Sequence, residues 1–443
     1  MSLKLEYVYD KLFSIYILGY MMNKITGLHA EDSSASINPG FLQFTSKDAS
    51  SDRSNIYTTS KIQLQVNFYE DLDSLPSSYE QFFKDVERKD FFISKAWLQN
   101  IFDTALEDGT KPCFYGVEAI DYNSTPQALF AFTTAPQTGA RINGWWVKGN
   151  AIAGTTNNLC YSHTFLYTDK TNNLSAAINA LIAQLKEDKY PLIDLNLFAG
   201  ESISLPLIRQ AFNNTGMKAS VYEYSSNWVE NTEHLDYQQY FANRSKSTRK
   251  SILRQKRRLQ EKHNVRFEIL TQESDVGKAI SLFNDVYAKS WKEPNYFQDF
   301  VPGLIRTCAK CGTLRFGVMY IDDKAVSVEL CITANNKATF AKSAYDSNYA
   351  KHSPSSILLL HMIEHVISSD NTKLLSLGLF DDAYKKTWCQ ERRIVYGIVA
   401  FDPNTFWGAI GYTVYSLKKS KDNILQRVKP LLKAFYKSSL ARF

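Results

Sequence analysis

The stretch SPSSILLLHMIEHVISSDNTKLLSLGLFDDAYKKTW, residues 353–388, decides the fold that we expect for this chain. It opens with a Ser-Pro pair that can cap and start a helix, and apolar residues then recur at helical spacing up to the Asp-Asn pair at 370–371. The run Leu374–Phe380 follows at once and predicts a short buried strand. A helix that leads directly into a buried strand indicates an α/β fold.

Reactive side chains gather where this strand ends. Polar groups at the carboxyl end of a strand usually face a crevice, and here they are Asp381, Asp382, Tyr384 and Lys385. The start of the neighbouring helix adds free backbone N–H groups and three hydroxyls, at Ser353, Ser355 and Ser356. Because a helix amino end attracts anions, this geometry predicts a site for a phosphorylated ligand.

The length and composition are those of a globular protein with more than one core. At 443 residues the chain exceeds what a single hydrophobic core usually serves, so two domains are expected. A formal net charge of +6 suits anionic ligands such as nucleotides, but it does not by itself indicate DNA or RNA binding. The sequence has no apolar run long enough for a transmembrane segment, and its six cysteines show no disulfide framework, which favours a cytoplasmic location.

The two ends of the chain differ from the rest. Residues 1–61 include a stretch rich in Ser, Asp, Asn and Thr with little periodicity, and they are expected to form a flexible leader. Residues 404–443 are basic and predict amphipathic helices, the second of which should be kinked or divided at Pro430. Docking against the second domain is the favoured interpretation of this tail, and contact with a membrane surface is the alternative.

The order of predicted elements repeats along the chain. A displacement of about 182 residues places Leu192 on Leu374 and Leu197 on Leu379, and in both copies a helix comes directly before this strand. Three strand-like runs also precede each helix, at 111–120, 127–135 and 159–167 in the first copy and at 313–321, 325–333 and 338–346 in the second. The sequence therefore predicts a duplicated α/β domain, with copies at 62–232 and 233–403.

A strongly basic helix is predicted at the start of the second copy, over residues 241–263. Its narrow packing stripe consists of Phe241, Thr248, Ile252 and Leu259. The other positions are largely cationic, namely Arg244, Lys246, Arg249, Lys250, Arg254, Lys256, Arg257 and Arg258. Such a face could neutralise phosphates of RNA, of a coenzyme or of an anionic glycolipid. A solvated face or a minor ligand contact is favoured, because the interleaved aromatic residues that stack on bases are missing from this stretch.

Short catalytic motifs are few. His361, Glu364 and His365 spell H-x-x-E-H, the inverted zinc-protease pattern, but the helix needs its apolar positions for packing and the sequence offers no third ligand. Cys308 and Cys311 form a single C-x-x-C, which we interpret as a helix end because a zinc ribbon needs a second pair. We therefore expect no metal site. The phosphate-loop, dinucleotide-binding and hydrolase-elbow patterns are also missing from the sequence, which argues against those three enzyme classes.

The second copy resembles a known family. The segments that carry the resemblance are RSKSTRKSILRQKRRLQEKHNVRFEIL, FNDVYAKSW, GTLRFGVMYIDDKAVSVELCI, SAYDSNYAKHSPSSILLLHMIEHV and LGLFDDAYKKTW. They are similar to the CelD/BcsL-like acetyltransferase family of the GNAT superfamily, which resembles the FemABX peptidoglycan aminoacyltransferases in placing two GNAT-type domains in one chain. The resemblance implies an α/β fold of two tandem GNAT-like domains, each with a mixed, mostly antiparallel sheet flanked by helices.

The family motif after the last helix maps onto six positions of this chain. Its aspartate, two glycines, acidic residue and Tyr-Lys pair fall on Ser376, Gly378, Phe380, Asp381, Tyr384 and Lys385. The chain departs from the motif at Ser376 and Phe380, and Ser355 stands where the family usually has glycine. Side chains at these positions hinder close approach of the backbone to a pyrophosphate, although a serine hydroxyl can donate a hydrogen bond to phosphate.

The resemblance implies an N-acyltransferase that moves an acyl group from acyl-coenzyme A, such as acetyl-coenzyme A, to an amine. Such an enzyme must hold donor and amine together, remove a proton from the amine and stabilise an oxyanion. The candidate catalytic residues are Glu329, Asp381, Asp382 and Tyr384. The candidate donor-binding residues are Ser353, Ser355, Ser356 and Lys385, and the candidate substrate-binding residues are Trp291, Tyr345 and Arg249. For the carboxylates, a salt bridge or a helix cap is an equally open role.

Three functions stay open at this point. The first is acyl transfer from coenzyme A to a small-molecule amine, an amino sugar or a cell-envelope precursor, and this is the function that we expect. The second is a FemABX-like transfer from aminoacyl-tRNA, to which the basic helix would contribute. The third is a catalytically degenerate GNAT-fold binding module, which the departures at Ser355, Ser376 and Phe380 favour.

Overall fold

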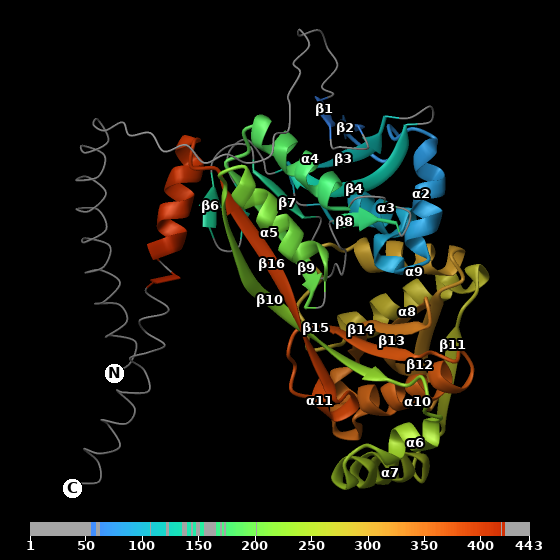
Figure 1. The fold of residues 1–443 in the computed structure, drawn as a ribbon. Coiled ribbons are helices and arrows are strands. Elements are labelled where there is room, and N and C mark those ends of the chain that lie inside the picture. Colours follow the sequence, from blue (N-terminus) through green and yellow to red (C-terminus); the bar gives the residue numbers. More distant parts are fainter. Residues whose placement is uncertain are drawn as a thin grey trace, which may run out of the picture. The chain divides into compact units, whose positions relative to one another are not determined.

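The helix and the strand predicted from residues 353–388 are both present. In the computed structural model they are α10 (Pro354–Ser368) and β15 (Leu374–Leu379), shown in Figure 1. Proline lies in the first turn of α10, where its missing N–H costs nothing, and most of the apolar side chains of the helix are buried. Asn371 turns the chain between the two elements with a left-handed φ of 51°, which asparagine tolerates well.

The structure describes residues 63–106, 108–120, 124–134, 151–154, 166–168, 171, 174–200, 202–417 and 419–420, and the backbone of 55–58, 140–142, 145–147 and 165. The predicted leader lies outside these residues, except that Asn55–Thr58 forms a strand, β1. The predicted second tail helix with Pro430 also lies outside them, whereas residues 406–417 are helical. Within the described ranges, the helices are too short or too polar to cross a bilayer.

The first half runs from strand to helices to strands in a set order. A strand is followed by two helices, three strands, a helix, a strand, a helix and a last strand: β2 (Gln63–Tyr69), α2 (Ser78–Glu87), α3 (Lys95–Thr104), β3 (Lys111–Ala119), β4 (Thr125–Thr134), β7 (Ile152–Gly154), α4 (Leu174–Glu187), β9 (Leu192–Ala199), α5 (Ser204–Asn214) and β10 (Lys218–Asn231). The short strands β5 (Ala140–Ile142), β6 (Trp145–Val147) and β8 (Phe165–Tyr167) are additions to this order.

The second half follows the same order. After two connecting helices, α6 (Tyr237–Ala242) and α7 (Lys246–Gln260), it contains β11 (Val265–Leu270), α8 (Val276–Ala288), α9 (Phe300–Lys310), β12 (Leu314–Ile321), β13 (Lys324–Ala334), β14 (Lys337–Tyr345), α10, β15, α11 (Lys385–Trp388) and β16 (Glu391–Phe401). Three short 3₁₀ helices are η1 (Phe91–Ile93), η2 (Glu273–Asp275) and η3 (Ser347–His352). The prediction of two α/β halves with mixed, mostly antiparallel pairing is confirmed by these elements and their pairing.

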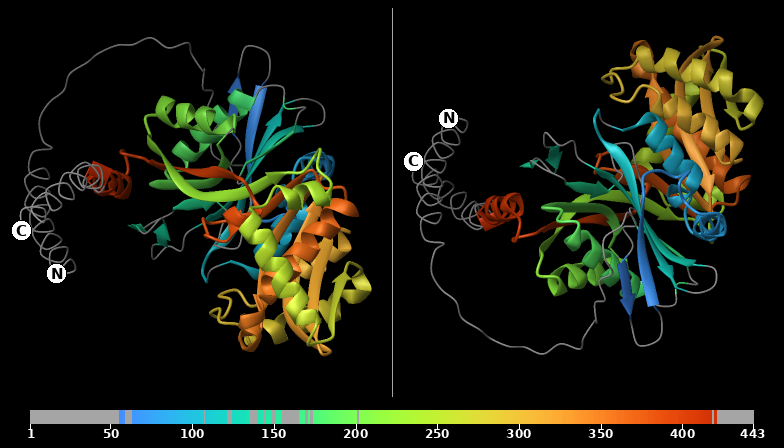
Figure 2. Two further views of the ribbon diagram at one scale, coloured as in Figure 1. Left: turned by 90° about the horizontal axis from the view of Figure 1, so that it is seen from below. Right: turned by 90° about the horizontal axis from the view of Figure 1, so that it is seen from above.

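The two halves exchange their last strands. In the main sheet of the described residues, the strand order is β1-β2-β3-β4-β7-β9-β16-β10-β15-β14-β13-β12-β11, with β8 beside β4. The last strand of the second half, β16, therefore pairs with β9, and the last strand of the first half, β10, pairs with β15. Strands β10 and β16 run antiparallel along each other through the middle of the sheet, as both views in Figure 2 show. One continuous sheet thus joins both halves.

Helices of the two halves also share a core. Trp97 of α3 packs edge-on against Phe300 of α9, with ring centroids 5.9 Å apart, and both side chains are fully buried. Next to this pair, Gly303 lets α9 approach α3 so closely that a Cβ at this position would lie 2.2 Å from the Asn100 side chain. The described residues consequently form one compact unit. The helices α8 and α9 of the second half lie on the side of that half that faces the first half (Figure 1).

Backbone geometry supports the predicted duplication. Lys189 and Asn371, which the displacement of 182 residues superposes, both have left-handed φ angles, of 59° and 51°. The strands that follow them begin at the superposed residues Leu192 and Leu374. A left-handed lysine is uncommon, so its presence at the matched turn indicates that the connection itself is repeated.

Two local expectations differ from the structure. The run at 159–167 was expected to be the third strand of the first copy, but its described part, β8, pairs with β4, and β7 takes the place beside β9. The basic helix is also divided, because Ser245 caps a new helix, α7, after α6 has ended. Arg244 lies in this break and is buried against Glu230 instead of belonging to the solvated cationic face.

Candidate active site

Two parallel strands of the second half separate and leave an opening between them. Strands β14 and β15 pair only where Lys337–Thr339 meets Leu374–Ser376, although β14 continues to Tyr345 and β15 to Leu379. Beyond Thr339 the edge of β14 that faces β15 has no ladder partner within the described strands. A strand edge of this kind can hydrogen bond to an extended ligand that carries amide groups.

Glu329 is a buried carboxyl in the middle of β13. It lies opposite Ser343 of β14 and Gly317 of β12, and only 5% of it is exposed. Gly317 faces Met362 and Leu358 of α10, so Glu329 lies on the same side of the sheet as α10. Burial raises the pKa of Glu329 to about 8, and the positive charge of Lys292 opposes this rise. The group therefore changes charge close to neutral pH.

Two lysines accompany Glu329 at the opening. The Lys292 ammonium donates a 2.6 Å hydrogen bond to the carbonyl oxygen of Ser343, directly opposite Glu329 on β14. Burial lowers the pKa of Lys292, while the charges of Glu329 and Asp382 raise it. Burial also lowers the pKa of Lys342 to about 8, with a further contribution from Lys292. Glu329 and Lys342 both have a pKa of about 8, and the charge of Lys292 acts on both groups.

Lys385 is used within the turn after β15. Its ammonium is buried and donates hydrogen bonds to the carbonyl oxygens of Gly378, Leu379 and Phe380, and it forms a 3.0 Å ion pair with Asp382. Gly378 and Phe380 have φ angles of 73° and 78°, a conformation that favours glycine and is rare for phenylalanine. Lys385 thus compensates several carbonyl groups of a strained turn and holds Asp382 beside the opening.

Asp381 and Tyr384 lie on the surface beside this turn. The Asp381 carboxylate accepts a 2.7 Å hydrogen bond from Nε1 of Trp228 and one of 2.9 Å from Nε of Arg392. These two bonds, that of Trp228 first, lower the pKa of Asp381, so it is ionised and a weak base at neutral pH. Tyr384 is half exposed.

The start of α10 lies in a positively charged region. Ser353 has a left-handed φ of 52° and caps the helix without a side-chain bond, and Ser355 and Ser356 are half-buried in the first turn. The His352 ring lies 5.7 Å from that of His263, which follows α7. Burial and the charges of Lys351, His263 and Lys262 lower the pKa of His352. Free N–H groups and cations from two elements therefore meet at this helix start.

The predicted substrate-binding residues are spread more widely. Tyr345 ends β14 and is half-buried, two residues from Ser343. Trp291 directly precedes Lys292 and is 68% exposed. Arg249 lies in the first turns of α7, where its Nε donates a 3.1 Å hydrogen bond to the Arg244 carbonyl oxygen. Of the three, Trp291 and Tyr345 are neighbours in sequence of the groups around Glu329.

Ser376 differs from the aspartate of the family motif in its contacts as well. Its hydroxyl donates a 3.1 Å hydrogen bond to the side-chain oxygen of Asn227 on β10. This bond joins the exchanged strand to β15, and Ser376 is buried. The hydroxyl is therefore already used within the sheet.

The described residues contain no cluster of three or more His, Cys, Asp and Glu side chains that could hold a metal ion. In the H-x-x-E-H segment, the His361 ring stacks on Phe267 with centroids 4.4 Å apart. His365 lies 3.9 Å from Asp370. These contacts give both histidines structural surroundings.

Lys292 and Lys342 are the site residues that sequence reasoning missed. Lys342 had a recognisable signal, because it interrupts the apolar strand ATFAKSAY. A lysine is rarely placed within a buried strand without a functional or structural role. Lys292 had none, since it lies in a connection between helices with no periodicity. Only the fold brings it to β14.

The comparison with protein families identifies the second half. Residues 246–386 match the model of the acetyltransferase (GNAT) domain. Residues 246–386, called the GNAT domain below, are therefore similar to this family. The matched range includes the opening between β14 and β15, Glu329, both lysines and the start of α10.

Similar solved structures are distant from this chain. FemX is 10% identical over 72% of this chain and 96% of its own, with a TM-score of 0.47. A tandem GNAT protein from the clavulanic acid biosynthesis pathway is 9% identical over 76% of this chain and 99% of its own, with a TM-score of 0.43. L-PGS from Bacillus licheniformis is 9% identical over 77% of this chain and 96% of its own, with a TM-score of 0.42. No curated protein sequence matches the chain.

Proposed function

We propose that the chain is an N-acyltransferase that moves an acyl group from acyl-coenzyme A to an amine of a small molecule, an amino sugar or a cell-envelope precursor. The observation that carries the proposal is Glu329, a buried carboxyl with a pKa near 8 at the opening of the GNAT domain. A base of this pKa takes a proton from an amine most effectively close to neutral pH. Residues 62–232 and 233–403 are the two proposed domains, and the reaction belongs to the second.

The residues present fit a coenzyme A thioester as donor. The open edge of β14 suits an extended chain with amide groups, such as the pantetheine arm. The start of α10 suits the phosphates, which its N–H groups and the hydroxyls of Ser353, Ser355 and Ser356 would bind. Lys262 and Lys351 add positive charge there. Ser376 lies in β15 and Phe380 directly follows it, so these two side chains do not belong to the start of α10.

Each step of the reaction has a group to perform it. Glu329 takes the proton of the amine as the new C–N bond forms, and backbone N–H groups along β14 donate to the oxyanion. The C–S bond then breaks, and Tyr384, which caps α11 after β15, returns a proton to the departing thiolate. Asp381 forms an ion pair with Arg392, and Asp382 forms one with Lys385. We therefore assign the role of the base to Glu329. Lys292 favours its ionised form.

The direct test is donor binding and turnover by the full chain. Isothermal titration with acetyl-coenzyme A should give binding, and release of free thiol should rise when a panel of amines is added. The variant Glu329→Gln should keep binding and lose amine-dependent thiol release. Glu233→Gln, which alters an exposed glutamate paired with Lys373, is the matched control and should behave like the parent protein. Absence of acetyl-coenzyme A binding would contradict the proposal.

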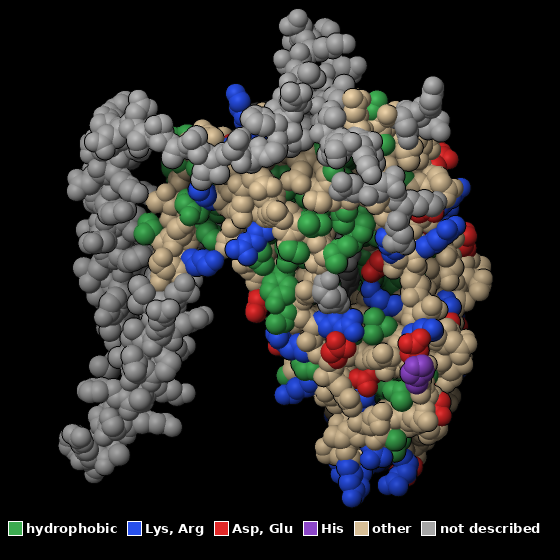
Figure 3. All heavy atoms as spheres, in the orientation of Figure 1, with side chains coloured by type: hydrophobic (Ala, Val, Ile, Leu, Met, Phe, Trp, Pro, Cys, Tyr) green, Lys and Arg blue, Asp and Glu red, His purple; other side chains and the backbone are tan. Residues whose placement is uncertain are grey.

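A second donor, aminoacyl-tRNA, is favoured by one observation. Six cations around α7 are exposed and gather at one end of the described protein, as Figure 3 shows: Lys246, Lys250, Arg254, Arg257, Arg258 and Lys262. The end of this helix adjoins the start of α10, so phosphates of a tRNA acceptor stem would meet both. Filter binding of charged tRNA at several salt concentrations separates the two donors. Tight, salt-dependent binding together with no acetyl-coenzyme A binding would favour tRNA.

A further inference from the structure

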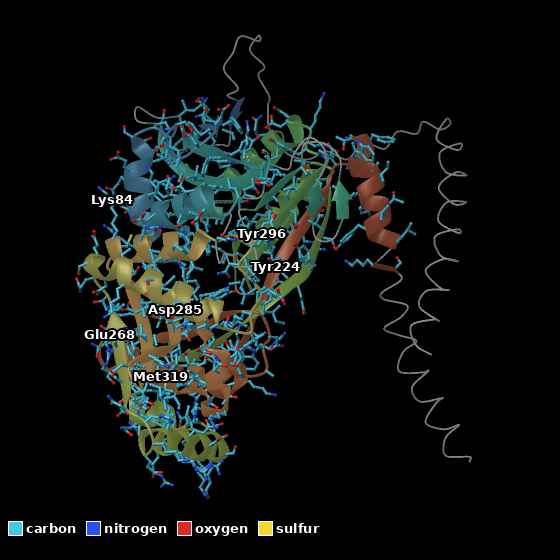
Figure 4. All side chains as sticks on the ribbon, turned by 180° about the vertical axis from the view of Figure 1, so that it is seen from behind. Lys84, Tyr224, Glu268, Asp285, Tyr296 and Met319 are labelled. Carbon is cyan, nitrogen blue, oxygen red and sulfur yellow. The ribbon has the colours of Figure 1, made fainter. Side chains whose placement is uncertain are left out.

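A pocket lies between the two helices that cover the other side of the GNAT domain. Its volume is about 420 Å³, and it is formed by the end of α8, the start of α9 and the connection between them. Figure 4 labels Asp285 on α8 and Tyr296 on this connection. All residues that line the pocket belong to the GNAT domain, and one of them is Lys292.

The lining offers hydrogen bonds that the protein itself does not use. Asn284, Asn295 and Gln298 line the pocket, and among the described residues none of their amide groups has a side-chain hydrogen bond. Each amide presents both donors and an acceptor. Asn284 and Gln298 are exposed and Asn295 is half-buried, so all three amides are accessible to a ligand. A ligand with several hydroxyl groups would satisfy these amides.

Aromatic side chains lie at the pocket and beside it. Tyr287 lines it, whereas Trp291 and Tyr296 belong to the same connection and are 68% and 78% exposed. Exposing two large rings within six residues of sequence loses burial of apolar surface that folding would otherwise gain. Their flat faces suit the C–H faces of a sugar ring. Amides for hydroxyls and rings for C–H groups together match a pyranose better than an aliphatic chain.

Lys292 connects the pocket with the base. It lines the pocket, yet its ammonium lies on the Ser343 carbonyl oxygen, opposite Glu329. A ligand amine placed beside the Lys292 stem would therefore lie at the opening of β14 and β15, with Glu329 across this opening on the α10 side of the sheet. The positive charge of Lys292 also disfavours a second ammonium nearby, which keeps the ligand amine in its reactive neutral form.

We propose that this pocket is the acceptor site and that the acceptor is an amino sugar, with its hydroxyls on the three amides and its amine directed to Glu329. The inference rests on the proposed acyl transfer and names the substrate class of that same site. Transfer from the thioester would give an N-acyl sugar and free thiol, and the amine proton would leave on Glu329.

The test compares three ring compounds by saturation-transfer NMR with the full chain. D-Glucosamine carries hydroxyls and an amine, D-glucose lacks the amine, and cyclohexylamine lacks the hydroxyls. We expect glucosamine to bind about tenfold more tightly than cyclohexylamine, which corresponds to about 1.4 kcal/mol. The variants Asn295→Ala and Trp291→Ala should each weaken glucosamine binding about tenfold by the same relation.

Two controls keep the outcomes distinct. Tyr412→Ala removes an exposed aromatic ring of the C-terminal helix and should leave glucosamine binding unchanged. Gln298→Ala changes an exposed pocket residue and is not expected to lower the melting temperature. It therefore tests the pocket if Asn295→Ala or Trp291→Ala melts at a lower temperature than the parent protein.

The result that overturns the proposal is equal or tighter binding of cyclohexylamine, or glucosamine binding that no pocket variant changes. Acetyl-coenzyme A titration of the same samples separates the two proposals. Loss of glucosamine binding with intact donor binding removes the acceptor assignment alone. Glucosamine binding without donor binding removes the acyltransferase assignment instead.

Discussion

The Lys292 ammonium lies 2.6 Å from the carbonyl oxygen of Ser343, on the β14 edge from which β15 has separated. Ser343 is the cross-strand neighbour of Glu329, so the lysine brings a positive charge to the one buried carboxyl of the GNAT domain that has no side-chain hydrogen bond in the described residues. Burial and this charge act on the Glu329 pKa in opposite directions. The pair thereby determines the pH at which the proposed base is ready.

Removal of the Glu329 carboxylate should abolish most of the proposed activity. Glu329→Gln keeps the shape of the side chain but cannot accept a proton, and general-base catalysis contributes about 10²–10⁴-fold. We expect kcat to fall by this amount with little change in acetyl-coenzyme A binding. In the parent protein the rate should rise as the pH passes through about 8, because Glu329 is active when deprotonated. A variant that retains this pH profile would show that another group is the base.

The Lys292→Met variant should move that profile. The substitution keeps an unbranched stem and removes the charge that opposes the rise in the Glu329 pKa. The midpoint of the rate profile should therefore shift above about 8, and the rate at pH 7 should fall because less Glu329 is ionised. Lys278→Met is the matched control, since Lys278 lies on α8 and pairs with Glu268 at the surface. An unchanged midpoint would exclude electrostatic coupling between Lys292 and the base.

A negative charge at the start of α10 should weaken donor binding without lowering the stability of the protein. Ser355→Asp adds a carboxylate in the first turn, which stabilises a helix by about 0.3–1 kcal/mol but repels phosphates. We expect the Kd for acetyl-coenzyme A to rise about tenfold, or 1.4 kcal/mol, while the melting temperature is kept or raised. Ser369→Asp places the same charge at the exposed C-terminal cap and should leave donor binding unchanged. Equal donor binding in both variants would place the phosphates elsewhere.

A buried ion pair stabilises the connection from the first half of the chain to the second. Arg244 pairs with Glu230 of β10, donates to the Trp388 carbonyl oxygen and covers the Tyr240 ring at 4.5 Å. Arg244→Met leaves Glu230 buried without its partner, and breaking a buried pair costs about 3–5 kcal/mol. Urea unfolding should show a loss of this size. Arg257→Met, at an exposed pair with Glu261, should change the free energy of unfolding by less than about 1 kcal/mol.

The sequence carried enough information for the duplication but not for the exchange of strands. The displacement that superposes Leu192 on Leu374 can be found from the apolar pattern alone, and the left-handed turns at Lys189 and Asn371 agree with it. Whether β10 or β16 lies beside β9 is a long-range choice that no local pattern decides. The carboxyls were predictable as candidates because of their positions in or after strands. The pKa of Glu329 depends on burial and on Lys292, which no local pattern places beside it.

Exchange of the last strands should make the two halves inseparable. A fragment of residues 233–403 lacks β10, so both β15 and β16 lose the strand that lies between them and expose long edges. Unprotected edges of this length favour aggregation, and the shared core of Trp97 and Phe300 is also divided. We expect either half alone to be insoluble or to lack near-ultraviolet circular dichroism. Co-expression with residues 62–232 should restore a soluble complex that purifies as one species. A folded, monomeric 233–403 fragment that binds acetyl-coenzyme A as tightly as the full chain would show that β10 is dispensable for the site.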